Sequence, residues 1–219
     1  MIEGPGRRHF HQRIESLERA TVAIGHEVAR SIPEATEAWL RRDCQAGGRV
    51  DARTAGWSER ARDVELTAYE QIATQQPMGV DLRRLMALVR LAEDVSRSGD
   101  LVAHVARSAC FDRPADAFSP ALRSLVVEMA ALASGEFVAA LEAFAAEDED
   151  AGKRVEADDA ALDALHQELL SALLAGDTEA GPAIDLALLG RFYERIGDHA
   201  VEIARRVSFV SSGALPGDS

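Results

Sequence analysis

Aromatic residues are scarce in this chain of 219 residues, and segments that look like β-strands are missing. Phe, Trp and Tyr make up 5% of the residues, although 47% of the side chains are hydrophobic. No cluster of Val, Ile, Thr and Tyr bounded by turn residues is present. The apolar residues are mostly Ala, Leu and Val, and the chain is long enough to bury a core of them. The composition therefore predicts an all-α fold of packed helices.

Long apolar segments and closely spaced cysteines are also lacking. No run of about 18 apolar residues occurs, and the polar, basic N-terminus has no apolar stretch behind it. These absences predict a cytoplasmic protein without its own membrane span. Cys44 and Cys110 are far apart and belong to no Cys-x-x-Cys or Cys/His spacing. We therefore expect two reduced structural thiols.

Positive charge is scarce as well. The 24 Lys and Arg residues are outnumbered by 37 Asp and Glu residues, which gives a formal net charge of −13. Such a surface repels nucleic-acid phosphates, so DNA or RNA binding is not expected. Nucleophile-elbow, P-loop and Gly-x-Gly-x-x-Gly motifs are also missing. Hydrolase, kinase and dinucleotide-binding functions therefore have no support in the sequence.

Helical periodicity is present along most of the chain. Phe10, Ile14, Leu17 and Ile24 lie on one seam of a first helix, which Pro33 kinks or ends. A polar, glycine-containing break is expected at residues 45–49. Five further helices are expected over residues 50–74, 81–109, 121–146, 153–174 and 183–211, followed by a loose tail.

Two of the expected helices carry the same sequence pattern. Residues 88–107 and 186–205 align at an offset of 98, with seven of twenty positions identical, and each segment contains Arg-x-Gly-Asp. A duplicated unit of three helices with short turns predicts two antiparallel three-helix bundles related by an approximate two-fold axis. We place the N-terminal repeat at residues 7–110 and the C-terminal repeat at residues 119–211.

Acidic residues line one face of the last two helices. Glu194, Asp198 and Glu202 recur at intervals of four, as do Asp159 and Asp163. Like charges at this spacing repel each other, so arginines or a metal ion must compensate. Four converging carboxylates would suit ferric iron, manganese or magnesium, with zinc less natural. The alternative interpretation is a set of solvated acidic residues in an acidic protein.

A glycine precedes the aspartate in both copies of the repeated helix. Gly99 and Gly197 each cost roughly 1 kcal/mol relative to alanine inside a helix. Their presence in mid-helix indicates either the close approach of a backbone or ligand, or tight helix packing.

The segment at 194–204, ERIGDHAVEIA, closely resembles the hallmark segment of the PhoU family, whose members regulate phosphate uptake. That family's metal motif is Glu/Asp-x-x-x-Asp. QQP at 75–77 and DLR at 81–83 resemble the family's turn into its third helix. The resemblance covers nearly all of residues 7–211.

This resemblance implies a cytoplasmic adaptor that is not an enzyme, that restrains phosphate uptake and signalling, and that binds multinuclear iron or zinc clusters. The implied partners are the ATPase subunit of the phosphate ABC transporter and the sensor histidine kinase of the phosphate two-component system. We expect a homodimer that reaches the membrane only through these partners, because an acidic surface is repelled by anionic headgroups.

The N-terminal repeat departs from the family's metal motif. Ser96 stands four residues before Asp100, and Thr54 and Ser58 stand where an acidic pair is usual. We therefore predict a competent metal site in the C-terminal repeat and a weakened or empty one around Asp100, assisted by His104 and by Glu93 or Asp94. The candidate metal ligands are Asp159, Asp163, Glu194, Asp198, Glu202 and Asp100.

Two other functions remain open at this point. A di-iron carboxylate oxidoreductase would use the same carboxylates, but that chemistry usually needs two Glu-x-x-His pairs. None of the six histidines lies three residues after a glutamate, and Asp163 with His166 is the nearest pattern. A helical adaptor without any metal is the second alternative.

Overall fold

Six long helices make up nearly all of the structure, a computed structural model that describes residues 5–112, 114, 117–176 and 178–213. No strand occurs among these residues, so the all-α prediction is confirmed. Part of the hinge expected at 111–120, and the tail from residue 214 on, lie outside the described residues. The helices are α1 (Pro5–Arg41), α2 (Cys44–Gln75), α3 (Val80–Ser108), α4 (Pro120–Ala146), α5 (Glu149–Ala175) and α6 (Ala180–Ser212).

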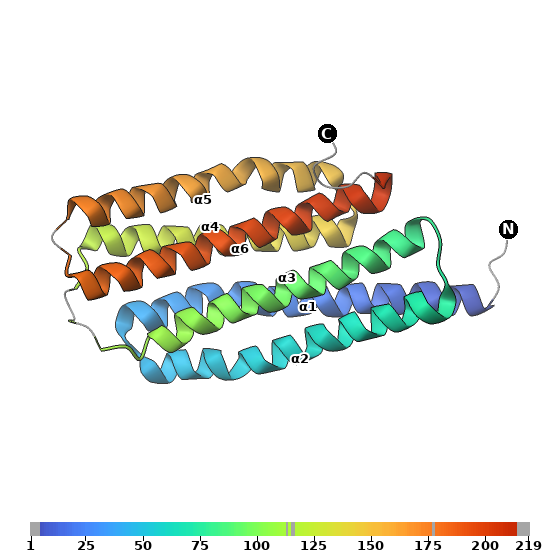
Figure 1. The fold of residues 1–219 in the computed structure, drawn as a ribbon, viewed down its shortest axis with the longest axis horizontal. Coiled ribbons are helices and arrows are strands. Elements are labelled where there is room, and N and C mark those ends of the chain that lie inside the picture. The colour runs from blue at the N-terminus through green and yellow to red at the C-terminus, as the bar shows by residue number, and fades with distance from the viewer. Residues whose placement is uncertain (1–4, 113, 115–116, 177, 214–219) are drawn as a thin grey trace.

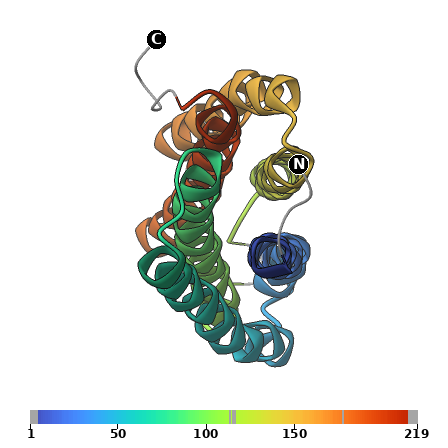
Figure 2. The same ribbon diagram turned by 90° about the vertical axis from the view of Figure 1, so that its right-hand side faces the viewer.

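The helices form two antiparallel three-helix bundles that lie side by side. Figure 1 shows α1, α2 and α3 in one bundle and α4, α5 and α6 in the other, with all axes near the long axis of the molecule. The end view in Figure 2 shows α1 beside α4 and α3 beside α6, and both pairs are in contact. The predicted architecture is therefore confirmed, and α2 and α5 lie on the outside.

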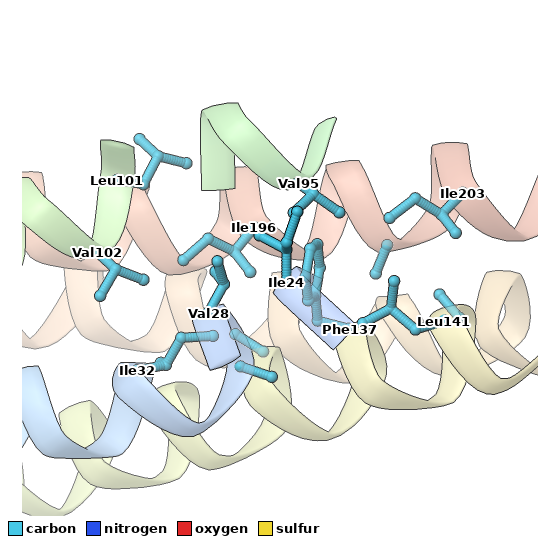
Figure 3. Close-up of a cluster of buried hydrophobic side chains, with 14 of the residues drawn as sticks. Ile24, Val28, Ile32, Val95, Leu101, Val102, Phe137, Leu141, Ile196 and Ile203 are labelled. Carbon is cyan, nitrogen blue, oxygen red and sulfur yellow. The ribbon is translucent and has the colours of Figure 1, made fainter. Parts of the chain in front are cut away.

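One apolar core runs through both bundles. Figure 3 shows Ile24 and Val28 of α1 close to Phe137 and Leu141 of α4, with α3 and α6 closing the cluster from the other side. Gly25 allows the close approach of α1 and α4, since a Cβ there would lie 2.6 Å from Leu141 Cδ1. Burial of this shared apolar surface is the main force that holds the two repeats together.

Polar contacts also join the repeats. The buried hydroxyls of Thr36 and Tyr193 are hydrogen-bonded at 2.7 Å. Asp94 of α3 forms a buried ion pair with Arg206 of α6. Because such groups are costly to bury without partners, these contacts fix how one bundle sits on the other.

Pro33 lies inside α1 and does not end the helix. A proline cannot donate a backbone hydrogen bond, so it leaves the carbonyl of Ala29 without its helical partner. Ser134 of α4 supplies a replacement, because its Oγ donates to that oxygen over 2.9 Å. A hydroxyl of the C-terminal repeat thus supplies the hydrogen bond that Pro33 removes from the N-terminal repeat.

The break expected at residues 45–49 is wrong, because this stretch forms the start of α2. Asp43 caps the helix by accepting a hydrogen bond from the Ala46 amide at 2.9 Å. Gly47 is needed for packing and not for a turn, because a Cβ there would lie 2.3 Å from the backbone oxygen of Ala106. The glycine lets α2 lie directly against α3.

The expectation of two reduced thiols is also wrong. Cys44 and Cys110 form a disulfide across a sequence separation of 66, with their Cα atoms 4.5 Å apart. Cys44 is the first residue of α2, and Cys110 lies two residues beyond α3. Antiparallel packing brings these two ends together, which no short cysteine motif can indicate.

Among the described residues, α4 is the one helix long and apolar enough to cross a membrane by composition. Its most apolar 18-residue window has a mean hydropathy of 1.6 and is 44% buried. The helix packs against α1, α5 and α6, so its apolar character also matches that of a core helix.

Candidate metal centre

Helices α5 and α6 run antiparallel and bring four acidic side chains into one electrostatic cluster, which we call the C-terminal acidic cluster. It consists of Asp159 and Asp163 on α5 and Glu194 and Asp198 on α6. The helices can approach closely because two glycines of α6 face leucines of α5. A Cβ at Gly190 or Gly197 would lie 2.6 Å from the nearest leucine methyl group, that of Leu169 or Leu162.

The cluster holds excess negative charge. Burial raises the pKa of Asp159, and the neighbouring carboxylates Asp163, Asp198 and Glu194 raise it further. Burial and Asp198 likewise raise the pKa of Glu194, although Arg191, with which Glu194 forms an ion pair, opposes the shift. The neighbouring carboxylates therefore make the ionised forms of Asp159 and Glu194 less favourable.

A fifth carboxylate, Glu136 of α4, lies beneath this cluster. Its exposed fraction is 8%, and neither of its carboxylate oxygens has a hydrogen-bond partner. Burial raises its pKa to about 7, and repulsion from Asp159, Asp158 and Asp163 adds to the shift. Glu136 could not be identified as a site residue from the sequence, because no acidic residue lies one turn away on its own helix. The available signal was a single carboxylate among the core positions Ala133, Phe137 and Ala140.

Gly197 is where these carboxylates meet the backbone of α6. A Cβ at this position would lie 3.0 Å from Asp159 Oδ1 and 3.2 Å from Glu136 Oε2. The glycine therefore leaves room for two carboxylates from different helices. At the matching Gly99 of the N-terminal repeat, the nearest atoms belong to Trp57 and Val28, which is simple helix packing.

The remaining two predicted ligands are not part of the cluster. Glu202 pairs with Arg205 at 3.0 Å and lies 3.9 Å from Arg206, so arginines of its own helix offset its charge. Asp100 is exposed on α3, in the other repeat.

The groups expected to assist Asp100 have other partners. Glu93 pairs with Arg90 and Arg97, and Asp94 pairs with Arg206. His104 stacks on Phe192 at a ring distance of 5.6 Å. Within the described residues, no acidic cluster around Asp100 therefore matches the C-terminal acidic cluster.

The equivalent face of the N-terminal repeat is electrically balanced. A groove of about 490 Å³ lies between α2 and α3. Its lining includes two arginines, two glutamates and two serines, namely Arg62, Arg97, Glu65, Glu93, Ser58 and Ser96. Nearby, Glu27 accepts hydrogen bonds from Trp57 at 3.0 Å and from Arg60 at 2.9 Å. The bond from Arg60 is the main reason why the pKa of Glu27 is lowered. Glu27 thus has a cationic partner, which Glu136 lacks.

The described residues contain no group of three or more His, Cys, Asp or Glu side chains arranged to hold a metal ion. The C-terminal acidic cluster nevertheless fits a cation in its chemistry. Hard cations prefer carboxylate oxygens, and the unpartnered oxygens of Glu136 have no neighbouring cation to offset their charge. A bound cation would remove the repulsion within the cluster.

Comparison with known proteins gives a consistent result along the whole chain. The PhoU domain pattern matches twice, at residues 22–109 and 126–207. The "Phosphate-specific transport system accessory protein PhoU homolog 1" of Mycobacterium leprae is 29% identical over 97% of this chain and 96% of its own length. The corresponding homolog 2 of Mycobacterium tuberculosis is 30% identical over 96% of this chain and all of its own length.

Solved structures share the fold. The phosphate transport system regulatory protein PhoU from Streptococcus pneumoniae superimposes with a TM-score of 0.85 at 20% identity, covering 94% of this chain and 99% of its own. PhoU from Pseudomonas aeruginosa gives the same TM-score at 25% identity, covering 94% of this chain and 100% of its own. The six-helix architecture is therefore common to all three proteins.

Proposed function

The chain belongs to the PhoU family, and we propose that it regulates phosphate uptake as an accessory protein of a phosphate-specific transport system. The observation that carries this proposal is the match of the PhoU pattern to both repeats, together with relatives that align over nearly their full length. These relatives are named as accessory proteins, which makes the chain a regulatory protein and not an enzyme.

The partners we propose are the ATPase subunit of the phosphate ABC transporter and the sensor histidine kinase that responds to phosphate. The chain would act on the cytoplasmic side as an adaptor between them, as a homodimer. Its net charge of −13 supports docking on proteins more than on anionic lipid.

A metal ion in the C-terminal repeat forms the second part of the proposal. Asp159, Asp163, Glu194 and Asp198 would hold it, and the ion would be iron, manganese, magnesium or zinc. The cation would supply positive charge that lets these carboxylates stay ionised together. Its role would be structural, because it would hold α5 against α6 on the face that meets a partner.

A deletion strain tests the regulatory part. We expect phosphate-responsive genes to stay active in high phosphate when the chain is absent, and expression of the intact chain to restore repression. A pull-down with the intact chain should recover the transporter or the kinase. Normal phosphate-responsive expression in the deletion strain, together with a pull-down that recovers neither partner, would contradict the proposal.

A metal-free adaptor is the second candidate, because the described residues show no arrangement of ligands ready to hold an ion. Metal analysis of protein purified without an affinity tag separates the two candidates. We expect bound metal in the parent and much less in a variant that combines Glu194→Ala and Asp198→Ala. A parent without metal, and a functional Asp198→Ala variant, would favour the metal-free adaptor.

A further inference from the structure

Glu136 is an unusual residue in this molecule. Among the residues that the structure describes, its Oε1 and Oε2 are the only buried side-chain nitrogen or oxygen atoms without a hydrogen-bond partner. The side chain is 8% exposed and sits in the middle of α4, the most apolar of the six helices. A carboxylate in such a place is strongly disfavoured unless something compensates its charge.

No cationic side chain in the described part of the chain provides that compensation. The charged groups that influence Glu136 are Asp159, Asp158 and Asp163, and all three are acidic. Glu136 Oε2 and Asp159 Oδ1 both lie within 3.2 Å of one point, the position that a Cβ of residue 197 would take. Two carboxylate oxygens from different helices therefore converge on the space that Gly197 leaves free.

The N-terminal repeat shows that the fold does not need a carboxylate at this position. There the corresponding glycine is Gly99, and its neighbours are Trp57 Cε3 at 3.3 Å and Val28 Cγ2 at 3.6 Å. The helix ends fix the correspondence between α1 and α4, because Arg42 and Asp43 follow α1 as Glu147 and Asp148 follow α4. Ser31 of α1 therefore occupies the place that Glu136 occupies in α4. The repeat without acidic ligands has at this point a buried serine, whose hydroxyl donates to the Glu27 carbonyl over 2.9 Å, and the repeat with them has a glutamate without a partner.

We propose that Glu136 is a ligand of the cation held by the C-terminal acidic cluster, so that three helices and not two build the site. This inference rests on the metal part of the proposed function. Glu136 would approach the ion from α4, on the core side, while Asp159 approaches it from α5. The ion would then offset the charge of the one buried carboxylate that no side chain compensates.

A ligand on α4 would connect the metal to the contact between the repeats. Ser134 lies within one helical turn of Glu136 on α4, and its hydroxyl donates to the Ala29 carbonyl of α1 over 2.9 Å. On the same helix, Leu141 packs against Gly25 of α1. Binding of the ion would therefore stabilise α4 in the position where it contacts the other repeat.

Titration calorimetry of the full-length, untagged protein with Mn²⁺ tests the proposal. We expect Glu136→Gln, which keeps the shape of the side chain, to weaken Mn²⁺ binding on the order of tenfold or more. Glu142→Gln is the matched control, since Glu142 lies exposed on the same helix, and it should leave the affinity unchanged. A purely packing role for Glu136 predicts equal affinities for both variants.

Thermal unfolding gives a second, independent measurement. Glu136→Val removes the buried carboxylate that has no partner, so we expect it to raise the melting temperature of the metal-free protein and to reduce the increase caused by Mn²⁺. A side chain that served only to fill space would not change these two quantities in opposite directions. A metal-free Glu136→Val protein that melts no higher than the parent would contradict the proposal.

The outcomes separate this inference from the proposed function. If the parent binds Mn²⁺ and Asp159→Asn weakens binding while Glu136→Gln does not, Glu136 is not a ligand and the two-helix site stands. If the parent binds neither Mn²⁺ nor Zn²⁺ nor Fe²⁺, both the metal part of the proposed function and this inference fail. The regulatory part is then still decided by the deletion strain.

Discussion

His199 is a buried histidine in α6 that the folded protein keeps uncharged. Its Nδ1 lies 2.9 Å from Ser98 Oγ of α3, and its exposed fraction is 8%. Burial lowers its pKa to about 4, and the positive charges of Arg195, Arg97 and Arg206 add to the effect. In the unfolded chain the pKa is near 6.5, so acid protonates the unfolded state first. Stability should therefore fall as the pH drops from 6.5 towards 4.

We expect this histidine alone to reduce the free energy of unfolding by about 2 kcal/mol between pH 7 and pH 5. Urea unfolding of the parent and of His199→Gln at both pH values measures the effect. Burial raises the pKa of Asp94 to about 6 and that of Glu136 to about 7. These two groups have the opposite effect, because they make the folded protein less stable as the pH rises. The parent and the variant both contain these two groups, so the difference between their pH responses isolates the effect of His199. An equal pH response in both proteins would contradict the assignment.

The spacing of side chains on a single helix could be read from the sequence, and so could the convergence of the carboxylates of α5 and α6. The contribution of a third helix could not. The interval of four predicted that Asp159 and Asp163 share a face with each other, as do Glu194 and Asp198. Glu202 continues the same interval but has Arg205 as its partner. The spacing along α6 gives no sign that this residue differs from Glu194 and Asp198. Glu136 could not be assigned, because its acidic neighbours are all on α5.

Two adjacent glycines at the start of α2 should respond in opposite ways to substitution by alanine. A Cβ at Gly47 would lie 2.3 Å from the Ala106 backbone oxygen, so Gly47→Ala should force α2 and α3 apart and destabilise the protein by about 1–3 kcal/mol. Gly48 has no atom within 4 Å of the same position, so Gly48→Ala should stabilise the protein by about 0.5–1 kcal/mol. Urea unfolding of both variants, with a thiol assay to confirm an intact disulfide, checks the signs. Equal effects would show that α2 and α3 do not touch here.

The disulfide between the ends of α2 and α3 should be detectable and reducible. Cys44 and Cys110 are both exposed, so a reductant can reach them. Protein purified without reductant should show no free thiols before treatment with dithiothreitol and two thiols after it. Because the bond closes a loop across a separation of 66 residues, the Cys44→Ser and Cys110→Ser double variant should lose about 4 kcal/mol in the free energy of unfolding if chain entropy dominates. Two free thiols in the untreated protein would contradict the bond.

Helix number and helix type could be predicted because apolar periodicity is a local signal. The predicted helix ends were less reliable, since glycine and proline can end a helix but can also lie inside one. Gly47 was interpreted as a break but serves a close helix contact, and Pro33 is accommodated because Ser134, 101 residues away, satisfies the Ala29 carbonyl. The sequence does not indicate such partners from another helix.

The contact between the repeats decides whether the molecule behaves as one unit. Its apolar part joins α1 to α4 and α3 to α6 within a single core, as Figure 3 shows for ten labelled side chains. The hydrogen bond between Thr36 and Tyr193 and the ion pair between Asp94 and Arg206 cross the same boundary. The duplicated sequence predicted two bundles but did not indicate that they share one core. The shared core arises because helices such as α4 are apolar on more than one face.

We therefore expect both repeats to unfold in one cooperative transition. The chain offers a direct test, because its two tryptophans, Trp39 and Trp57, are both buried in the N-terminal repeat. Tryptophan fluorescence thus reports on that repeat, whereas far-UV circular dichroism reports on all six helices. For a two-state protein, the two signals should give the same midpoint in urea.

A substitution in the other repeat makes this test stricter. Leu169 is fully buried in α5, far along the chain from either tryptophan, and Leu169→Ala should cost about 2–5 kcal/mol. If the repeats unfold together, this change lowers the fluorescence midpoint as much as the dichroism midpoint. Leu88→Ala, an equally buried substitution in α3, should shift both signals in the same way. A fluorescence midpoint that stays in place while Leu169→Ala lowers the dichroism midpoint would show that each repeat unfolds on its own.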